Sequence, residues 1–484
     1  MNLMALRYKR FHTSRLLGWL ALGVLLGLIV GETVTLQNDA LWVMVALVFV
    51  LGGFRSARWW AVGVILIAGL ILGTIRGSNE TQRYAAYEEL VGSSTQVTGK
   101  MSGDAQQAGS GQQRVTLTNV SIGGVGYVGE IFATLYSDAA LKRGDKLVIS
   151  GQVDEGFASY AASIRSGKLQ SVERGNDIIR DIREQFAAVV RSVVVEPIAS
   201  LGLGFVVGQR STLPEELDEQ LKIVGLTHIV VASGYNLTIL ARFVMRLLSR
   251  HSRYLALVGS LGVVFAFVLF SGFSPSMNRA VIVTVLSLLA WYVGRRFHPA
   301  LLIGYVAAGT AFFNPMYVWS DLGWYLSFFA FAGILIVAPL VIHTLYRRRQ
   351  ASSFEQLVFE TVSAEMVALP LIAFAFGVVP ALGLIANVLV APFIPVAMAL
   401  TALTGVVAMV SSVLATIFAL PMMLLIGYMV AIVEWLSSLP IAQYDVVVGF
   451  WALLIWYGVL IVGCIILQRR LHYDFNARDR ELEV

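Results

Sequence analysis

The sequence predicts a polytopic α-helical membrane protein with about twelve (ten to thirteen) transmembrane helices, some of them broken, and a small extracytoplasmic β-barrel of the OB type. Hydrophobic residues make up 57% of the chain and charged residues 13%, whereas soluble domains carry roughly 25% charged residues. Apolar runs close to the ~20-residue length of a spanning helix recur along most of the chain. One stretch with a different, alternating pattern interrupts them.

Twelve apolar runs are candidates for the membrane helices. In chain order they are Leu16–Gly31, Leu41–Phe54, Trp59–Ile75, Ile223–Leu248, Leu255–Phe270, Ala280–Val293, Ala300–Phe313, Leu322–Ile342, Val358–Val379, Leu382–Val410, Val413–Val433 and Val447–Leu467. The first run lacks a small-residue cleavage site, so we expect no removable signal peptide. The single cysteine, Cys464, excludes an intrachain disulfide and a cysteine-based metal cluster.

Basic residues flank these runs in a pattern that sets the orientation of the chain. Arg7, Lys9, Arg10 and Arg15 precede the first run, and the loop after it, Glu32–Asp39, is acidic. The positive-inside rule therefore places the N-terminus in the cytoplasm, and twelve crossings return the C-terminus to the same side. The third run then delivers the segment that follows it to the outer face of the membrane.

The chain is predicted to have five parts. Residues 1–75 form an N-terminal membrane segment of three helices, and residues 76–175 form the extracytoplasmic OB-like domain. Residues 176–200 form an amphipathic interfacial helix, residues 201–468 form a second membrane domain, and residues 469–484 form a cytoplasmic tail.

The outer segment Ser94–Glu173 contains five short alternating stretches separated by Gly-rich breaks. They are QVTGKM, RVTLTNV, GEIFATLY, GDKLVISGQV and ASIRSGKLQSV. Five short strands of this kind predict a small OB-type barrel. Such barrels often hold single-stranded nucleic acid by stacking bases on aromatic side chains in a basic groove. Aromatic residues are few here and the charges nearly balance, so a structural role as a cap or assembly surface is an equal alternative.

A helix with two unlike faces is predicted after this insert. Apolar residues recur at helical spacing from Ile178 to Val193, while Arg180, Arg183 and Arg191 occupy the other face. This pattern indicates an amphipathic helix that lies on the outer membrane surface or, as the alternative, packs against the insert.

Five clusters of polar residues fall in or beside the predicted membrane helices, where polar groups are costly and usually face a bundle interior or a wet cavity. In the stretch GLTHIVVASGYN, Gly234 can interrupt the helix where the backbone lines such a cavity. In FSGFSPSMNRAVI, Pro275 can start a helix that carries polar residues in its first turns. The candidate residues are His228, Ser233, Gly234, Asn236, Ser276, Asn278, Arg279, Asp321, Ser327, Glu365 and Asn387.

Arg279 and Glu365 are the costliest of these groups. An isolated charge at mid-membrane costs several kcal/mol, so we expect the two to form a pair or to line two walls of one aqueous path. Interfacial placement is the alternative, because both lie near predicted helix ends. For His228, an interfacial histidine bonded to backbone is the commoner arrangement.

The sequence gives little support for a catalytic site. His228 and Ser233 are reminiscent of the dyad of an intramembrane serine protease, but on one helix they lie roughly 140° apart and need a break at Gly234 to meet. The six histidines are scattered, so we expect no metal site. The phosphate-binding pattern G-x-x-x-x-G-K-[ST] is absent from the sequence. We therefore expect neither a catalytic site nor a cofactor.

Four segments resemble, in matching order, the motifs of the ComEC competence-protein family of inner-membrane proteins. They are GLGFVVGQRSTLPEELDEQLKIVGLTHIVVASGYNLTIL, FSPSMNRAVIVTVLSLLAWYVGRR, NPMYVWSDLGWYLSFFAFAGI and ALPLIAFAFGVVPALGLIANVLVAPFIP. The insert also resembles that family's OB-like domain, notably in GDKLVISGQV. Carried over residue by residue, the family's membrane motifs fall on Gly225, His228, Ser233, Gly234, Ser276, Arg279, Gly323, Leu326, Ser327, Pro370, Asn387 and Pro392.

The resemblance implies a channel component, not an enzyme, that moves single-stranded DNA across the bacterial cytoplasmic membrane during natural transformation. Membrane lipid, a separate DNA receptor, a nuclease and a cytoplasmic helicase-like ATPase are the implied partners. Two features depart from the family: Asn236 stands where many members carry His, and the chain ends at Val484 where many members continue into a metallo-β-lactamase-like domain. On physical grounds, a secondary transporter or an intramembrane hydrolase for a small or lipidic substrate is the alternative.

Overall fold

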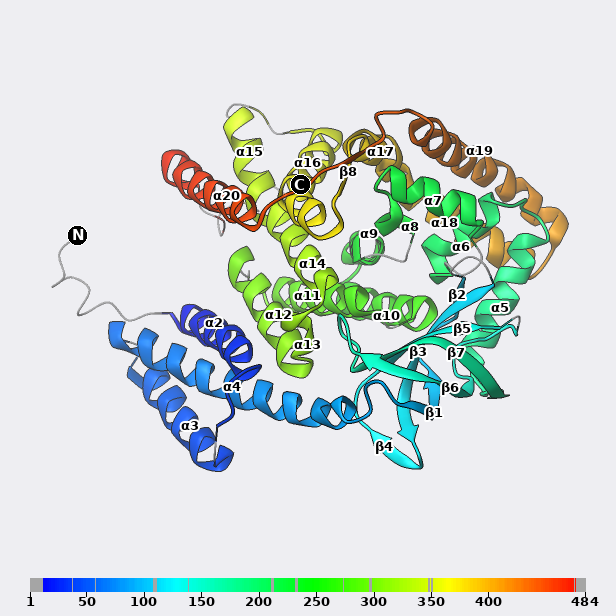
Figure 1. The fold of residues 1–484 in the computed structure, drawn as a ribbon. Coiled ribbons are helices and arrows are strands. Elements are labelled where there is room, and N and C mark those ends of the chain that lie inside the picture. The colour runs from blue at the N-terminus through cyan, green and yellow to red at the C-terminus, as the bar shows by residue number, and fades with distance from the viewer. Residues whose placement is uncertain are drawn as a thin grey trace. The chain divides into compact units, whose positions relative to one another are not determined.

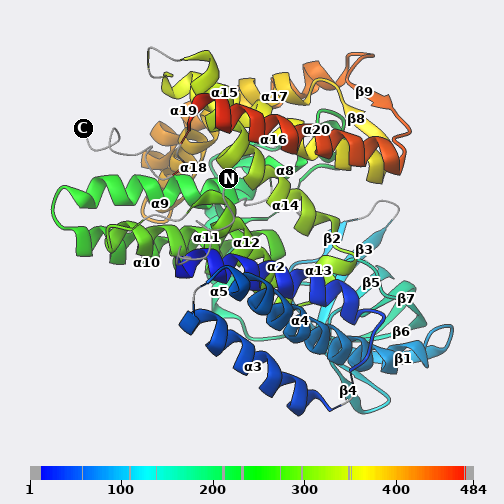
Figure 2. The ribbon, with the colours of Figure 1, turned by 90° about the vertical axis from the view of Figure 1, so that its left-hand side faces the viewer.

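The structure is a computed structural model with two compact units. One unit comprises residues 1–176 and 300–325, and the other comprises residues 177–299 and 326–484. Figures 1 and 2 show the elements of each unit in two views. The described residues are 12–36, 38–56, 58–107, 111–137, 139–209, 213–230, 234–272, 274–295, 298–346, 349, 351–473 and 475.

Nine helices in the described part of the chain are long and apolar enough to cross a membrane, and each coincides with one of the twelve predicted runs. The other three runs fall on helices that are shorter or less apolar, so the count of twelve is not confirmed. Those runs correspond to α9 (Gly234–Ser249), α11 (Pro275–Tyr292) and α12 (Pro299–Phe313). The nine spans are Thr13–Gly31, Asp39–Ser56, Trp59–Glu88, Arg253–Ser271, Leu322–Leu345, Phe354–Phe376, Gly383–Ala408, Ser412–Ser437 and Phe450–Leu471.

The first unit begins with three helices, α2 (Thr13–Gly31), α3 (Asp39–Ser56) and α4 (Trp59–Glu88). Helices α2 and α4 are neighbours in Figure 2, and glycines at every fourth position of each helix meet across their interface. A Cβ atom added at Gly27 would lie 2.1 Å from the backbone oxygen of Leu70, and one at Gly73 would lie 2.2 Å from that of Val24. The two backbones therefore touch, as in small-residue interfaces of membrane helices.

Helix α4 extends well past Ile75, where the apolar run ends. Its polar continuation is stabilised by ion pairs at helical spacing: Arg76 Nη1 lies 2.6 Å from Glu80 Oε2, and Arg83 Nη1 lies 3.5 Å from the same atom. The predicted end at Ile75 is therefore too early. Tyr87, in the last turn of α4, is buried in the core of the following β domain.

That β domain is a closed barrel. Its five long strands join in the order β1–β3–β5–β7–β6–β1, with β5 and β7 parallel and the other pairs antiparallel. This is the arrangement of an OB-type barrel, so the predicted barrel is confirmed. The long strands are β1 (Ser94–Met101), β3 (Gln112–Ile122), β5 (Ile131–Tyr136), β6 (Lys146–Glu155) and β7 (Ala162–Glu173), while the short strands β2 (Gln106–Gln107) and β4 (Val125–Tyr127) pair with β3.

Residues 300–325 complete the first unit by packing on both its helices and its barrel. The segment contains most of α12, the short helix α13 (Met316–Trp319) and the start of α14 (Leu322–Ala332). Trp319 Nε1 donates to the carbonyl of Leu28 in α2 at 2.9 Å. The hydroxyl of Ser320 donates to the carbonyl of Ala158, in the loop between β6 and β7.

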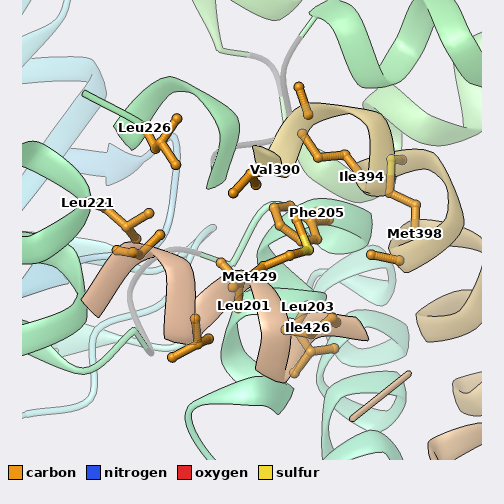
Figure 3. Packing of buried hydrophobic residues seen from close by; sticks show 14 of the residues in the cluster. Leu201, Leu203, Phe205, Leu221, Leu226, Val390, Ile394, Met398, Ile426 and Met429 are labelled. Carbon is orange, nitrogen blue, oxygen red and sulfur yellow. The ribbon is translucent and has the colours of Figure 1, made fainter. Parts of the chain in front are cut away.

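The second unit is helical and contains an extended apolar core. Helix α6 lies inside it, and Leu201, Leu203 and Phe205 pack against helices that come from distant parts of the sequence (Figure 3). A two-stranded antiparallel sheet of β8 (Val378–Pro380) and β9 (Gln443–Asp445) links two helix connections. The helices not yet given are α5 (Ile178–Arg191), α6 (Ile198–Val207), α7 (Glu215–Ile223), α8 (Thr227–Val230), α10 (Arg253–Ser271), α15 (Ala338–Leu345), α16 (Ser353–Phe376), α17 (Gly383–Val390), α18 (Ile394–Ala408), α19 (Ser412–Ser437) and α20 (Phe450–Leu471).

Helix α5 occupies the segment predicted to be amphipathic. Its buried side, with Ala187 and Val190, packs within the apolar core of the second unit, and Phe186 contacts Gly405 of α18. Ile178 and Ile182 remain exposed. Helix α5 contacts α6, α10 and α18 of the same unit. Its place at the membrane surface stays a prediction.

Candidate functional site

The first polar cluster includes residues of α8 (Thr227–Val230) and α9 (Gly234–Ser249). Helix α8 ends at Val230 and α9 begins at Gly234, while Ser233 lies outside the described residues. His228, in α8, is exposed, whereas Asn236, in the first turn of α9, is fully buried. Residues 231–233 lie outside the described part of the chain, so the break at Gly234 stays a prediction.

Gly234 also brings α9 close to α11. A Cβ atom added to Gly234 would lie 2.5 Å from the Cβ atom of Ala280, a separation that two packed side chains do not adopt. Because Ala280 follows Arg279 directly, this contact sets the start of α9 beside the part of α11 that carries the arginine.

Helix α11 begins at Pro275, as predicted from the fixed φ angle of proline at a first helical position. The hydroxyl of Ser274 caps it by accepting a hydrogen bond from the backbone N–H of Met277 at 3.2 Å. In the first turns Ser276 is exposed and Asn278 is half-buried, whereas Arg279 is 1% exposed. This arginine is among the largest fully buried side chains in the described part of the chain.

Arg279 and Glu365 hydrogen-bond to different partners. Arg279 Nη2 donates to Ser327 Oγ of α14 at 2.8 Å. Glu365, in α16, accepts from Asn387 Nδ2 of α17 at 2.6 Å. The structure therefore brings four of the predicted residues together as two polar pairs within the second unit, each joining two helices.

Asp321 belongs to the first unit, where its carboxylate has a structural function. Asp321 Oδ1 accepts a hydrogen bond from the backbone N–H of Trp324 at 3.2 Å, so it caps α14. A negative charge at a helix N-terminus is stabilised by the helix dipole. Gly323 lies next to this cap. A Cβ atom added at Gly323 would lie 3.1 Å from Asp321 Oδ1.

The helices around Glu365 depart from regular α geometry at three places. Between α14 and α15 the chain forms a π-helix, η1 (Gly333–Val337), and a Cβ atom added at Gly333 would lie 2.5 Å from the carbonyl oxygen of Ser363 in α16. Helix α17 is followed directly by a 3-10 turn, η2 (Ala391–Phe393). Helix α16 contains Pro370. Short π segments inside helices are frequent at functional sites.

Side chains of α20 bond to backbone carbonyls of α16 near Pro370. Proline lacks the N–H that would bond to the carbonyl of Met366 four residues earlier. Trp456 Nε1 of α20 donates to that carbonyl at 3.2 Å, and the hydroxyl of Tyr457 donates to the next carbonyl, Val367, at 2.9 Å. The position of Pro370 identifies the freed acceptor in advance, but no sequence pattern identifies the donors.

A second candidate site lies on the outer surface of the barrel, where β3 and β5 pair. Three aromatic rings gather there, with ring centroids 5.1 Å apart for Phe132–Phe157, 5.3 Å for Phe132–Tyr160 and 5.4 Å for Phe157–Tyr160. Phe132 is on β5, and the other two rings are on the loop between β6 and β7. An open pocket of ≈ 390 Å³ beside them is lined by Arg114, Phe132, Thr134, Phe157, Ser163, Ile164 and Arg165.

The charges at this pocket are mixed. Arg114 and Arg165 are exposed, and Arg165 Nε lies 3.3 Å from Asp154 Oδ2. Burial raises the pKa of Glu130 above its usual range. Burial also raises the pKa of Tyr160, and the nearby carboxylates of Glu130 and Asp321 add to that rise. The Tyr160 hydroxyl therefore stays protonated and neutral.

No group of three or more His, Cys, Asp or Glu side chains that could hold a metal ion occurs among the residues that the structure describes. The groups described at the two sites can form hydrogen bonds, stacking contacts and charge interactions. In the membrane region those groups are Arg279, Ser327, Glu365 and Asn387, and on the barrel they are the aromatic rings and two arginines.

Known proteins resemble this chain over parts of its length. A family model described as "Competence protein" matches residues 205–470, which is more than half of the chain. An uncharacterized protein of Aquifex aeolicus (strain VF5) is 30% identical over 161 residues, covering 33% of this chain and 38% of that protein. The chain thus spans well under half the length of that relative. No solved structure matches it.

Proposed function

The chain belongs to the competence-protein family and is an integral membrane protein, and from this premise we propose that it is a channel component that moves single-stranded DNA across the bacterial cytoplasmic membrane. The proposal rests chiefly on the barrel. Strands β3 and β5 and the loop between β6 and β7 correspond to the surfaces with which OB folds bind oligonucleotides. In this chain those three elements carry the three aromatic rings and Arg114, and Arg165 of the same pocket lies on β7.

The aromatic pocket suits a single strand better than a duplex. Unpaired bases expose their π faces and stack on aromatic side chains without regard to sequence, while arginines contact the phosphates. Phe132 and Thr134 point outward from β5, because alternate residues of that strand fill the barrel core. Thr116 and Arg114 face the same way from β3, directly opposite Phe132 and Thr134.

In the membrane region, Arg279 is the side chain best suited to a passing phosphate. Its guanidinium offers a fork of N–H donors, and one of them is held by Ser327. Gly234 allows α9 to approach α11 at this level. A duplex would have to be made single-stranded and then drawn inward, so a DNA receptor, a nuclease and a helicase-like ATPase are the proposed partners, and both chain termini are proposed to be cytoplasmic.

A secondary transporter is a second candidate because α14–η1–α15 and α17–η2–α18 are discontinuous helices, a common feature of transporters. The two functions differ in what they need from the barrel. A transporter for a small substrate has no use for an aromatic site on the barrel, whereas a DNA channel does.

The decisive experiment measures entry of labelled DNA into cells that lack the gene and carry a restored copy. Wild type and Arg246→Ala, which changes an exposed arginine in the last turn of α9, should restore uptake. Arg279→Ala at equal abundance should not. Normal uptake with Arg279→Ala would remove this residue from the route, and unchanged uptake in the deletion strain of a competent host would favour the transporter.

A binding measurement tests the barrel separately. We expect the full chain in lipid nanodiscs to bind a fluorescent oligo(dT), and we expect Phe132→Ala and Phe157→Ala each to weaken binding about tenfold, because each stacked base contributes about 1–3 kcal/mol. Tyr136→Ala, on the same strand but outside the pocket, is the matched control. Equal losses in all three variants would argue against a defined stacking site.

A further inference from the structure

Glu365 has an unusual position for a carboxyl group. It lies near the middle of the 24-residue helix α16, which is long and apolar enough to span the membrane. Asn387, its hydrogen-bond partner, is buried. The proposed passage of DNA does not call for a carboxylate here, since a polyanion is repelled by a negative charge.

The partner of Glu365 is a neutral amide rather than a cation. Asn387 Nδ2 donates to Glu365 Oε1 at 2.6 Å. In the described part of the chain no Lys or Arg nitrogen lies within 4.0 Å of this carboxylate. An amide carries both donor and acceptor atoms, so Asn387 can serve a carboxylate through its N–H groups and a protonated carboxyl through its oxygen.

Other titratable or charged groups occur on the elements packed against α16. On α16 itself, Glu355 pairs with Arg349 at 2.6 Å. On α20, the hydroxyl of Tyr457 donates to the backbone of Val367. The remaining groups are Glu360 on α16, His343 on α15 and Cys464, Arg469 and Arg470 on α20, while η1, α17 and β8 carry none.

The backbone on each side of the pair is irregular. The π-helix η1 packs on α16 through Gly333, at Ser363 and Ala364, immediately before Glu365. Pro370 interrupts the hydrogen bonds of α16 just after it, and Asn387 lies four residues before the 3-10 turn η2. Helices with such interruptions change their packing more readily than regular ones.

We propose that Glu365 and Asn387 form a proton-binding site whose occupancy is linked to the packing of α16, α17 and η1. Glu365 carries a proton at neutral pH, because ionising a half-buried carboxyl in an apolar, membrane-spanning helix is disfavoured when its hydrogen-bond partner is a neutral amide. On release, the O–H bond of Glu365 breaks, the proton passes to a water molecule of the adjoining aqueous phase, and the carboxylate keeps the amide hydrogen bond. Solvation of that new charge requires the surrounding helices to shift.

Infrared difference spectroscopy on the full chain in lipid nanodiscs tests this proposal without DNA. We expect a protonated-carboxyl C=O band in the wild type at pH 7 that disappears as the pH is raised. At pH 7 it should be missing from Glu365→Gln and retained in Glu360→Gln, which changes the other central acid of the same helix. In Asn387→Leu, loss of the amide that serves the carboxylate should make the band persist to higher pH.

One spectroscopic result would contradict the proposal. If spectra of wild type and Glu365→Gln agree in the protonated-carboxyl region at pH 7, Glu365 is ionised and the proposal is wrong. Circular dichroism establishes that each variant is folded, and the Asn387→Leu titration provides the answer should Glu365→Gln fail to fold. Because the measurement contains no DNA, its outcome is independent of whether the chain conducts DNA.

Discussion

Pro370 leaves the carbonyl of Met366 without its helical N–H, and the indole of Trp456 donates to that carbonyl instead at 3.2 Å. Inside a membrane no water is present to bond to such a carbonyl, so a neighbouring helix must supply the donor. The last helix, α20, is otherwise largely exposed on its surface, as expected for a helix surrounded by lipid. Its contribution to α16 is therefore concentrated in Trp456 and Tyr457.

The hydrogen bond from Trp456 can be tested by a double-variant cycle. Trp456→Phe should lower the free energy of unfolding by about 1 kcal/mol, the usual net contribution of one hydrogen bond. In a Pro370→Ala background the helix regains its own N–H donor, so Trp456→Phe should then cost much less. Denaturant unfolding of the full chain in detergent measures both, with the exposed Trp451→Phe as control. An equal loss in both backgrounds would show that Trp456 acts through packing alone.

Glu130 predicts a pH dependence of barrel stability. Burial raises the pKa of this carboxyl in the folded state, so its ionisation is costlier in the folded than in the unfolded chain. The contribution of Glu130 to the free energy of unfolding is therefore most favourable at pH values below its pKa in the unfolded chain. This contribution is lost as the pH rises through the raised pKa of the folded state. Glu130→Gln should stabilise the barrel at the high end of this window and leave it unchanged at the low end.

Thermal unfolding of the full chain across this pH range provides the measurement. Glu173→Gln, which changes a well-exposed acid at the end of β7, is the control and should follow the wild type. A stabilisation by Glu130→Gln that did not depend on pH would mean that the substitution acts through shape rather than through charge.

The residues of the candidate site could be predicted in part. Arg279, Glu365 and Asn387 stand out because ionisable or amide groups are rare in apolar runs, and the structure places all three in polar pairs between helices. Which side chains face each other depends on the packing order of helices far apart in the sequence. We expected Arg279 and Glu365 to form a pair or to line two walls of one aqueous path; their hydrogen-bond partners in the structure, Ser327 and Asn387, could not be identified from the sequence alone.

At the level of elements, the close contact of α2 and α4 depends on glycine. Gly73→Leu should destabilise the pair by about 1–3 kcal/mol or more, because the new side chain meets the backbone of Val24 and cannot displace it. Gly63→Leu, on the same helix but with open space around it, should have little effect. Unfolding of the full chain in detergent compares the two, and similar stabilities would contradict a backbone contact at Gly73.

The elements themselves differ in how far the sequence predicts them. The five barrel strands were predicted because alternating residues and Gly-rich breaks leave a clear local pattern, and all five occur. Helix α4 was predicted to end too early because its continuation is polar and is held by ion pairs and by Tyr87 in the barrel core. The small-residue spacing in α2 and α4 is visible in the sequence, but its meaning requires both helices to be seen together.

At the level of the whole molecule, α4 joins a membrane helix pair to the barrel without a flexible linker. Thr81→Pro, placed between Gly77 and Tyr84, should kink the helix there, because proline removes one hydrogen bond and clashes with the preceding turn. If the proposed function holds, oligo(dT) binding by the full chain should change less than twofold, whereas DNA uptake should fall markedly. Thr81→Ala is the control, and unchanged uptake with Thr81→Pro would show that a continuous α4 is not needed.

The 30 residues of α4 correspond to about 45 Å of helix, more than the ~30 Å hydrocarbon thickness of a bilayer. One end is fixed by direct backbone contact with α2, and the other is fixed by Tyr87 inside the barrel. A continuous, rigid helix therefore connects the barrel to the membrane helices of the first unit. If the proposed function holds, a force on single-stranded DNA bound at the barrel surface would act as tension along α4 and as shear between α4 and α2. The barrel would then keep a constant distance from the bilayer while the DNA moved.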